Sequence, residues 1–203
     1  PAFSWWLEPG VPAASWKPLL VAQGFSHEPE LPGLALRLAD LDGTAAAGAI
    51  PPDSARLEIF PVETPSARRA WAETFVAGNE YRADMAGPLF DVYGDLHGPG
   101  SPLVSYLAYA DGVPVATSSV FYAAGVAGLY DIATLPAWRG RGIGSAVTRT
   151  PLLAARGRGY RAAVLQSSSK GVRLYERLGF RTVCNIEHFV RDAGRKACLA
   201  RRS

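Results

Sequence analysis

One stretch of the chain concentrates residues that could bind an anionic ligand: Leu135-Pro136-Ala137-Trp138-Arg139-Gly140-Arg141-Gly142-Ile143-Gly144-Ser145. Glycine reaches positive φ values without strain and lets the backbone approach a ligand closely. A helix that begins after such a loop presents unpaired backbone amides at its positive end. Arg139 and Arg141 add positive charge beside those amides. The stretch therefore predicts a site for a pyrophosphate group at the start of a helix.

Two common phosphate-binding loops fit this stretch poorly. A P-loop requires Gly-Lys-Ser or Gly-Lys-Thr, which the chain does not contain. A dinucleotide-binding loop would use Gly140, Gly142 and Ser145 in place of three glycines, and it requires an acidic residue about 20 positions later. Residues 155–165 contain no acid. Taken by itself, the loop is also consistent with a tight strand-to-helix turn that binds no ligand.

A second motif, Leu174-Tyr175-Glu176-Arg177-Leu178-Gly179-Phe180, begins 30 residues after Gly144. With both motifs, the chain resembles the Gcn5-related N-acetyltransferase superfamily. The cofactor motif of that superfamily, Gln/Arg-x-x-Gly-x-Gly/Ala, is matched by Arg139, Gly142 and Gly144. Its later motif, Leu-Tyr-x-x-Leu-Gly-Phe, is matched in full. The resemblance covers roughly residues 56–190.

The resemblance implies a binding mode for acetyl-CoA. The ligand would lie in a V-shaped opening between two splayed parallel strands, here those ending near Thr134 and Leu165. The backbone of residues 132–134 would pair with the pantetheine arm, as an added strand pairs with a sheet edge. Tyr175 would act as general acid and protonate the departing thiolate. The implied cofactor-binding residues are Ile132, Ala133, Thr134, Arg139, Gly140, Arg141, Gly142, Ile143, Gly144, Ser145 and Ser168.

Two positions depart from the pattern of the superfamily. Ser168 stands where many relatives have an asparagine that touches pantetheine, so it offers a hydroxyl contact or only caps the next helix. Gly128 stands where many relatives have a carboxylate, so no general base is assured. Glu80, Asp91 or Asp131 could assist, although each also reads as a surface carboxylate. Strand alternation predicts that Asp131 points away from the face shared by Tyr130 and Ile132.

The sequence thus predicts an acetyl-CoA-dependent N-acetyltransferase that acts on a primary amine. Attack would be direct, in a ternary complex, because neither cysteine lies in a motif typical of an acyl carrier. The alternative is a non-catalytic acyl-CoA-binding or sensing module. We expect acceptor specificity to come from residues 64–97, with either an apolar cleft or core packing formed by Trp71, Phe75, Tyr81, Phe90 and Tyr93. Four acids in or near that segment suit a cationic acceptor or a solvated face: Glu80, Asp84, Asp91 and Asp95.

Composition limits the other classes. The chain has 203 residues, 48% hydrophobic and 19% charged, so it can bury a core and is not disordered. No apolar run reaches the roughly 20 residues that a membrane-spanning helix needs, and no secretory pattern opens the chain. Cys184 and Cys198 are too few for a disulfide framework, and the three histidines lie too far apart for a local metal motif. We expect a reducing cytoplasm, no metal and no membrane. Because the chain begins at Pro1 rather than Met, we expect that upstream residues are missing.

The charge is asymmetric along the chain. Residues 1–138 carry 6 Lys+Arg and 15 Asp+Glu, whereas residues 139–203 carry 15 and 3. A basic end indicates an anionic partner. Aromatic residues are not interleaved with the basic ones, so we do not expect nucleic acid. Nucleic-acid binding would weaken steeply with salt and would not require Arg139.

Hydrophobic periodicity predicts the elements that position these motifs. Strands are expected at residues 57–62, 103–110, 113–122, 126–135, 162–165 and 181–190, with a hairpin turn at Asp111-Gly112. Helices are expected at 64–77, capped by Thr64, and at 142–156 and 171–178, whereas 84–96 is a helix or a loop. Pro151 should kink or shorten its helix. This α/β (α+β) pattern predicts a mixed, mostly antiparallel sheet with splayed central parallel strands and helices on both faces.

The first 50 residues form a separate region. A strand at 3–7, a helix at 15–23 and a strand at 34–38 are expected there, and residues 43–52 form a linker. Leu20–Phe25 resembles Tyr175–Phe180 at an offset of 155 residues, so we interpret residues 1–50 as a degenerate remnant of a second acetyltransferase-like fold or as a chance match. The predicted domains are 1–50, 51–190 and a basic tail at 191–203. Trp5, Trp6 and Trp16 allow either a homodimer contact or burial within the chain.

Overall fold

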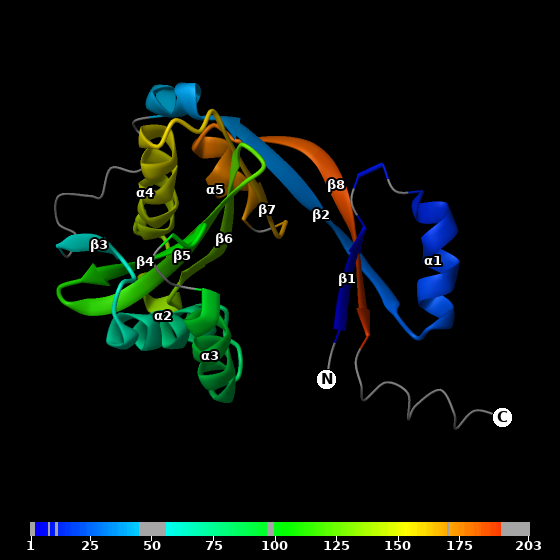
Figure 1. Cartoon of the computed structure of the whole chain (residues 1–203), viewed down its shortest axis with the longest axis horizontal. Coiled ribbons are helices and arrows are strands. Elements are labelled where there is room, and N and C mark those ends of the chain that lie inside the picture. The colour runs from blue at the N-terminus through cyan, green and yellow to red at the C-terminus, as the bar shows by residue number, and fades with distance from the viewer. Residues whose placement is uncertain are drawn as a thin grey trace. The chain divides into compact units, whose positions relative to one another are not determined.

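A computed structural model describes residues 3–7, 9–10, 12–44, 56–96, 100–169 and 171–191 (Figure 1). These residues form two compact units whose segments interleave along the chain. The first unit contains the described parts of residues 1–34, 166–172 and 182–203, and the second contains those of 35–165 and 173–181. Most of the expected linker, and the tail beyond Arg191, lie outside the described residues. The predicted boundaries at residues 50 and 190 stay predictions.

The second unit is built on a sheet with the strand order β7-β6-β5-β4-β3. Its strands are β3 (Leu57–Pro61), β4 (Leu103–Ala110), β5 (Val113–Ala123), β6 (Val126–Thr134) and β7 (Ala162–Gln166). Neighbours are antiparallel except β6 and β7, which are parallel. The expected turn between β4 and β5 is confirmed, since Asp111 and Gly112 have φ values of 50° and 79°. Positive φ at both central residues matches the twist of a two-residue hairpin.

Helices cover both faces of this sheet, which confirms the predicted fold class (Figure 1). Helices α2 (Pro65–Gly78) and α3 (Ala86–Leu96) lie on one face, and α4 (Ile143–Gly157) lies on the other. The short helix α5 (Val172–Arg177) precedes the last strand. Thr64 caps α2 as expected, because its hydroxyl accepts a hydrogen bond from the amide of Ala67 at 3.1 Å. Each face of the sheet packs against its helices through its own apolar cluster, one around Trp71 and Leu107 and the other around Ile143 and Val147.

Strand β6 contains one residue more than its partner β5 over their shared length. Thr117 pairs with Ala133, but Ser119 pairs with Tyr130, so both residues 131 and 132 stand opposite Ser118. Asp131 has φ 54°, which an L-residue adopts only at a cost. The hydroxyl of Thr117 donates to the carbonyl of Asp131 at 2.8 Å and satisfies an acceptor that the bulge removes from the ladder.

Pro151 does not shorten α4, which runs through it to Gly157. A proline inside a helix has no amide for the carbonyl four residues earlier, here that of Val147. The hydroxyl of Ser118 donates to this carbonyl at 2.7 Å, and both partners are buried. Of the two expected effects, a kink or a shortened helix, the shortening was wrong, and a side chain of the sheet replaces the missing bond.

Four of the described helices end with the same hydrogen bond, in which a backbone amide just after the helix donates to a carbonyl five residues earlier. After α5, the amide of Phe180 donates to the carbonyl of Tyr175 at 3.0 Å, and Gly179 has φ 91°. After α1 (Ala13–Ala22), the amide of Phe25 donates to the carbonyl of Leu20 at 3.0 Å. Helices α2 and α4 end in the same way. Because this motif ends helices outside the suspected repeat as well, it does not single the repeat out, and the degenerate second fold stays a prediction.

The first unit has its own sheet and core. Its strands are β1 (Phe3–Leu7), β8 (Arg181–Arg191) and β2 (Ser26–Arg37), in the order β1-β8-β2, with β1 and β8 antiparallel. Helix α1 (Ala13–Ala22) belongs to the same unit. Leu7, Leu20 and Phe189 form its buried cluster. The three tryptophans of this unit are exposed by 43–46%, so burial within the described chain does not account for them.

We predict that Ser118→Ala lowers the free energy of unfolding by about 1–3 kcal/mol, because the buried carbonyl of Val147 loses its donor. The loss should shrink in a Pro151→Ala background, where the new backbone amide supplies the missing bond. Urea unfolding of the wild type, both single variants and the double variant measures this coupling. An equal cost of Ser118→Ala in both backgrounds would contradict the replacement of the helical bond by Ser118.

Candidate active site

The parallel strands at the centre of the second unit separate soon after they meet. β6 pairs with β7 only at Ala127–Ala163 and Gly128–Val164. Beyond Gly128, β6 continues for six residues to Thr134 with β5 as its pairing partner. Among the described residues of the second unit, no strand therefore lies beside the backbone groups on the side of β6 that faces away from β5. An extended ligand arm can satisfy such groups by adding to the edge.

A glycine-rich loop follows this strand and opens α4. Gly140 and Gly142 have φ values of 77° and 78°, a conformation that favours glycine. Gly142 is the residue before the first turn of α4, and its carbonyl accepts the amide of Ala146 at 3.1 Å. The amides of the first helical turn, residues 143–145, have no partner within the helix. Together with the helix dipole they form a site suited to a phosphate group.

The loop and α5 approach each other closely at Gly144. A Cβ built on Gly144 would lie 3.0 Å from Cδ1 of Leu174 and 3.5 Å from the hydroxyl oxygen of Thr134. Glycine at this position thus lets the start of α4 pack against the end of β6 and against α5. The next residue of α5 is Tyr175. The structure therefore brings the two motifs recognised in the sequence side by side.

Tyr175 is 9% exposed, and its ring makes an edge contact with Phe180. Burial raises the pKa of its phenol to about 12. A phenol in this environment stays protonated at neutral pH and can donate a proton.

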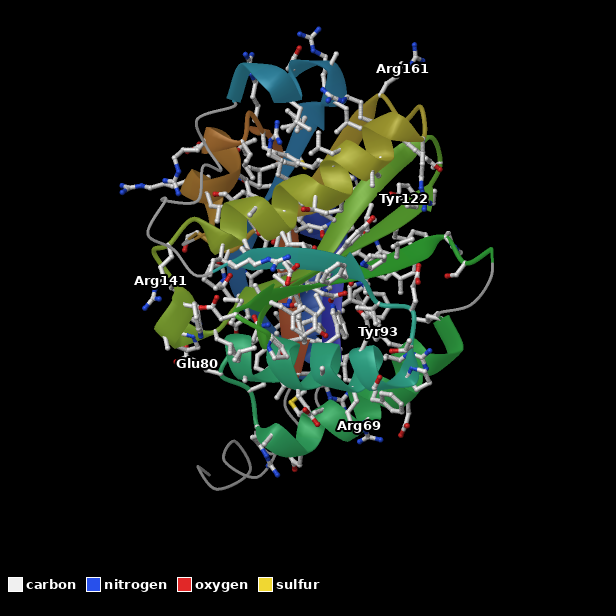
Figure 2. The ribbon with its side chains drawn as sticks, turned by 90° about the vertical axis from the view of Figure 1, so that its left-hand side faces the viewer. Arg69, Glu80, Tyr93, Tyr122, Arg141 and Arg161 are labelled. Atoms are coloured by element: carbon white, nitrogen blue, oxygen red, sulfur yellow. The ribbon has the colours of Figure 1, made fainter. Side chains whose placement is uncertain are left out.

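Arg139 does not point freely into the loop. Its guanidinium donates to the carbonyl of Thr134 at 3.2 Å and to that of Gly78, the last residue of α2, at 2.7 Å. Glu80 lies 3.6 Å from the same guanidinium. The side chain of Arg139 therefore joins the end of α2 to the end of β6. Arg141 is exposed and stacks over the ring of Trp138 at 4.9 Å, and it lies in Figure 2 on the same side of the molecule as Glu80.

The other predicted cofactor residues divide into two groups. The side chains of Ala133, Ile143 and Ser145 are buried, and that of Ile132 packs on the core beside α4, so these residues can offer a ligand only their backbone. Ser168 is exposed and lies in the first unit, where its carbonyl accepts the hydroxyl of Ser167 and the amide of Gly171. All predicted ligand contacts stay predictions.

A carboxylate lines a cavity on the α3 side of the sheet. The cavity has a volume of about 270 Å³, and Tyr93, Phe121, Tyr130 and Asp131 are among its lining residues. The hydroxyl of Tyr93 donates to Oδ2 of Asp131 at 2.6 Å. Burial, then the neighbouring Asp131, raises the pKa of Tyr93. Figure 2 shows Tyr93 between α3 and the strands.

The bulge explains why this cavity was not foreseen. Alternation predicted that Tyr130 and Ile132 share a face and that Asp131 points away from it. In the structure Tyr130 and Asp131 line the same cavity, while Ile132 packs on the core beside α4. The prediction was wrong because the extra residue shifts the alternation of side chains. A Cβ on Gly128 would also lie 2.9 Å from the ring of Tyr130, so this ring leaves no room for a side chain there.

The remaining candidates of the acceptor segment are less suitable. Trp71 is fully buried, and its ring centre lies 5.6 Å from that of Phe75, on which it stacks, and 4.6 Å from that of Tyr93. Trp71 therefore belongs to the hydrophobic core and does not line a cleft. Tyr81 is 51% exposed and lies outside the cavity. Glu80 and Asp91 are exposed and do not line this cavity, and Glu80 lies instead beside the guanidinium of Arg139.

Comparison with known proteins identifies the class of this fold. Residues 102–182 match the family model of the acetyltransferase (GNAT) domain. A GCN5-related N-acetyltransferase from Kribbella flavida superposes with a TM-score of 0.64 at 25% identity, over 92% of this chain and 66% of its own. One from Sphaerobacter thermophilus gives 0.64 at 17% identity, over 94% and 59%. A protein described as a tandem GNAT protein from the clavulanic acid biosynthesis pathway gives 0.61 at 18%, over 95% and 64%.

Residues 102–182 therefore form a GNAT acetyltransferase domain, which confirms the resemblance indicated by the two motifs. The chain spans 59–66% of the length of these three structures. No curated protein is detectably similar to it in sequence. Within the described residues, no helix is long and apolar enough to cross a membrane. The same residues contain no group of three or more His, Cys, Asp or Glu side chains that could hold a metal ion.

We predict that Arg139→Ala lowers the free energy of unfolding by about 1 kcal/mol, because the bridge between α2 and β6 is lost. Arg139→Lys should not restore it, since an ammonium group lacks the fork that reaches two carbonyls. Arg141→Ala, two residues away, should change stability by less than about 0.5 kcal/mol. Thermal or urea unfolding of the three variants tests this order, and equal stabilities would refute the bridging role.

Proposed function

We propose that this chain transfers an acetyl group from acetyl-CoA to a primary amine by direct attack in a ternary complex. The separation of β6 from β7 after Gly128 carries this proposal, because it exposes a strand edge that ends at the anion-binding start of α4. The GNAT match and the neighbouring Tyr175 support it. We also propose that the protein is located in the cytoplasm and forms a homodimer.

The residues around this opening suit acetyl-CoA. The backbone of residues 132–134 would hold the pantetheine arm, and the amides between Gly140 and Ser145 would hold the pyrophosphate. The open space around Gly140, where a Cβ would meet nothing within 4 Å, leaves room for such a group. When bound, acetyl-CoA supplies a thioester carbonyl that an amine can attack.

Tyr175 would act as the general acid. Its phenol is kept protonated by burial, and it follows Leu174, which packs against the start of α4. Transfer of the phenolic proton to the departing sulfur prevents the release of an unprotonated thiolate.

Asp131 would receive the amine. The carboxylate is the acidic group that lines the cavity, and the hydroxyl of Tyr93 holds it in one orientation. An ammonium group binds there by charge and by hydrogen bonds, and the carboxylate can take its proton directly or through water before attack. The apolar surroundings formed by Phe121 and Leu103 favour an amine on a small apolar body.

A non-catalytic acyl-CoA-binding module is the second candidate. Gly128 and Ser168, at positions where relatives carry functional side chains, favour it. Tyr175 favours catalysis, because a module that only binds has no use for a general acid.

Residues 1–50, proposed as the remnant of a second GNAT-like fold, would then serve as a scaffold, and the likeness to a protein described as a tandem GNAT supports that origin.

We predict that Tyr175→Phe lowers kcat by about 100-fold and leaves the Kd for acetyl-CoA unchanged. Since burial raises the pKa of Tyr175 to about 12, kcat should not fall as the pH passes the ordinary phenol value of about 10. Coenzyme A release, followed with a thiol reagent across a screen of primary amines, measures kcat. Calorimetry measures acetyl-CoA binding. Binding without turnover on any amine would favour the non-catalytic module.

We predict that Asp131→Asn raises KM for the amine by about 10- to 100-fold, because a neutral amide cannot form an ion pair with an ammonium group. Tyr93→Phe removes the hydrogen bond but keeps the charge, so its effect should be several-fold smaller. Acetyl-CoA binding serves as the control in both variants. An unchanged KM in Asp131→Asn would remove this residue from the proposed acceptor site.

A further inference from the structure

A larger cavity adjoins the one that Asp131 lines, and the proposed reaction does not use it. It has a volume of about 670 Å³. It lies where β3 ends, between the first turn of α2, the start of β4 and the residue that follows α4. The two cavities share Ser101 and Leu103 in their walls, so both open beside the first residues of β4.

Two arginines from distant parts of the chain line this cavity. Arg68 comes from the first turn of α2, and Arg158 is the residue that caps α4. Neither forms an ion pair with a residue that the structure describes. Among the described residues that line the cavity, Glu63 is the one acid, so positive charge is in excess there.

The position of Arg68 contributes little to the stability of the fold. A cation in the first turn of a helix is opposed by the positive end of the helix dipole. Nε of Arg68 is buried and has no hydrogen-bond partner among the described residues, and its guanidinium lies 5.6 Å from the centre of the Phe90 ring. An anion in the cavity would pair with the guanidinium and would also be favoured by the same end of α2.

Arg158 is held in position by an aromatic ring. Its guanidinium stacks over the ring of Tyr122 at 4.6 Å, and Figure 2 shows Tyr122 near the outer end of β5. Tyr106 also lines the cavity. Burial raises the pKa of Tyr106, against a smaller opposite effect of Arg158, so its hydroxyl stays protonated and can donate to an anion.

We propose that this cavity binds the anionic end of the acceptor, a carboxylate or phosphate, while the amine end of the same molecule lies at Asp131. The acceptor is then a zwitterion with its charges at opposite ends, matched by Asp131 in one cavity and by Arg68 and Arg158 in the next. This inference rests on the proposed function for its amine end. The anion site itself rests only on the larger cavity, which Arg68 and Arg158 line.

The first test compares acceptors of equal length that differ in the anionic group. ω-Amino acids from β-alanine to 6-aminohexanoate are paired with the n-alkylamines of the same chain length, and kcat/KM is measured for each. At one chain length the amino acid should exceed its partner by about tenfold or more. Arg158→Gln and Arg68→Gln should abolish this preference by raising KM for the amino acid, with the alkylamine unaffected.

Arg69→Gln is the matched control. Arg69 follows Arg68 on α2 and also lies over the ring of Phe90, at 4.8 Å, but it does not line the cavity. Its removal should leave the preference intact. Equal rates within every pair, or a preference that survives both Arg158→Gln and Arg68→Gln, would overturn the proposal while leaving amine acetylation established.

A second test does not need turnover. Inorganic phosphate is titrated into ¹⁵N-labelled protein with coenzyme A present to fill the loop before α4, and the Nε–H signal of Arg68 is followed. The signal should shift in the wild type and in Arg69→Gln, and the shift should be lost in Arg158→Gln. An unmoved signal would overturn the anion site, whichever amines are acetylated. A shift without any acetylated amine would retain the anion site and reject its role in an acceptor.

Discussion

The extra residue in β6 is the constraint on which the candidate site depends. It places Tyr130 and Asp131 on the α3 side of the sheet and sends Ile132 to the core on the other side. The same strand leaves β7 just before the bulge, at Gly128. One strand thus supplies both a carboxylate in a cavity and a backbone edge with no strand beside it. Neither feature would exist if β6 paired regularly with both of its neighbours.

Adjacent hydroxyls on β5 compensate for two irregularities, one in the neighbouring strand β6 and one in helix α4. Thr117 donates to the carbonyl that the bulge frees, and Ser118 donates to the carbonyl that Pro151 leaves without an amide. Successive side chains of a strand point to opposite faces, so two neighbouring residues can serve the strand beside them and the helix above. Buried polar groups at these positions would otherwise be unpaired at a cost in stability.

Local signals in the sequence predicted much of the fold. Asp111-Gly112 specified a hairpin, Thr64 specified a helix cap, and the glycines around Gly142 specified a strand-to-helix loop, because each acts through its own backbone or its nearest amides. The face of the sheet on which the Asp131 side chain lies could not be predicted, since it depends on the register of β6 against β5. That Arg68 and Arg158 line one cavity could not be predicted either, because these residues lie 90 positions apart in the chain. Arg139 matched a motif, but its contact with Gly78 required the structure.

The interleaving of the two units bears on the order in which the chain can fold during synthesis. Residues 35–165 hold all but a short part of the second unit, so most of its contacts can form once residue 165 has left the ribosome. The first unit must wait, because β1 pairs with β8, and these strands are separated by most of the chain. Until β8 emerges, Leu7 and Leu20 lack Phe189, the third member of their core cluster. The nascent N-terminal segment therefore carries exposed apolar side chains for most of translation, a state in which chaperones commonly bind.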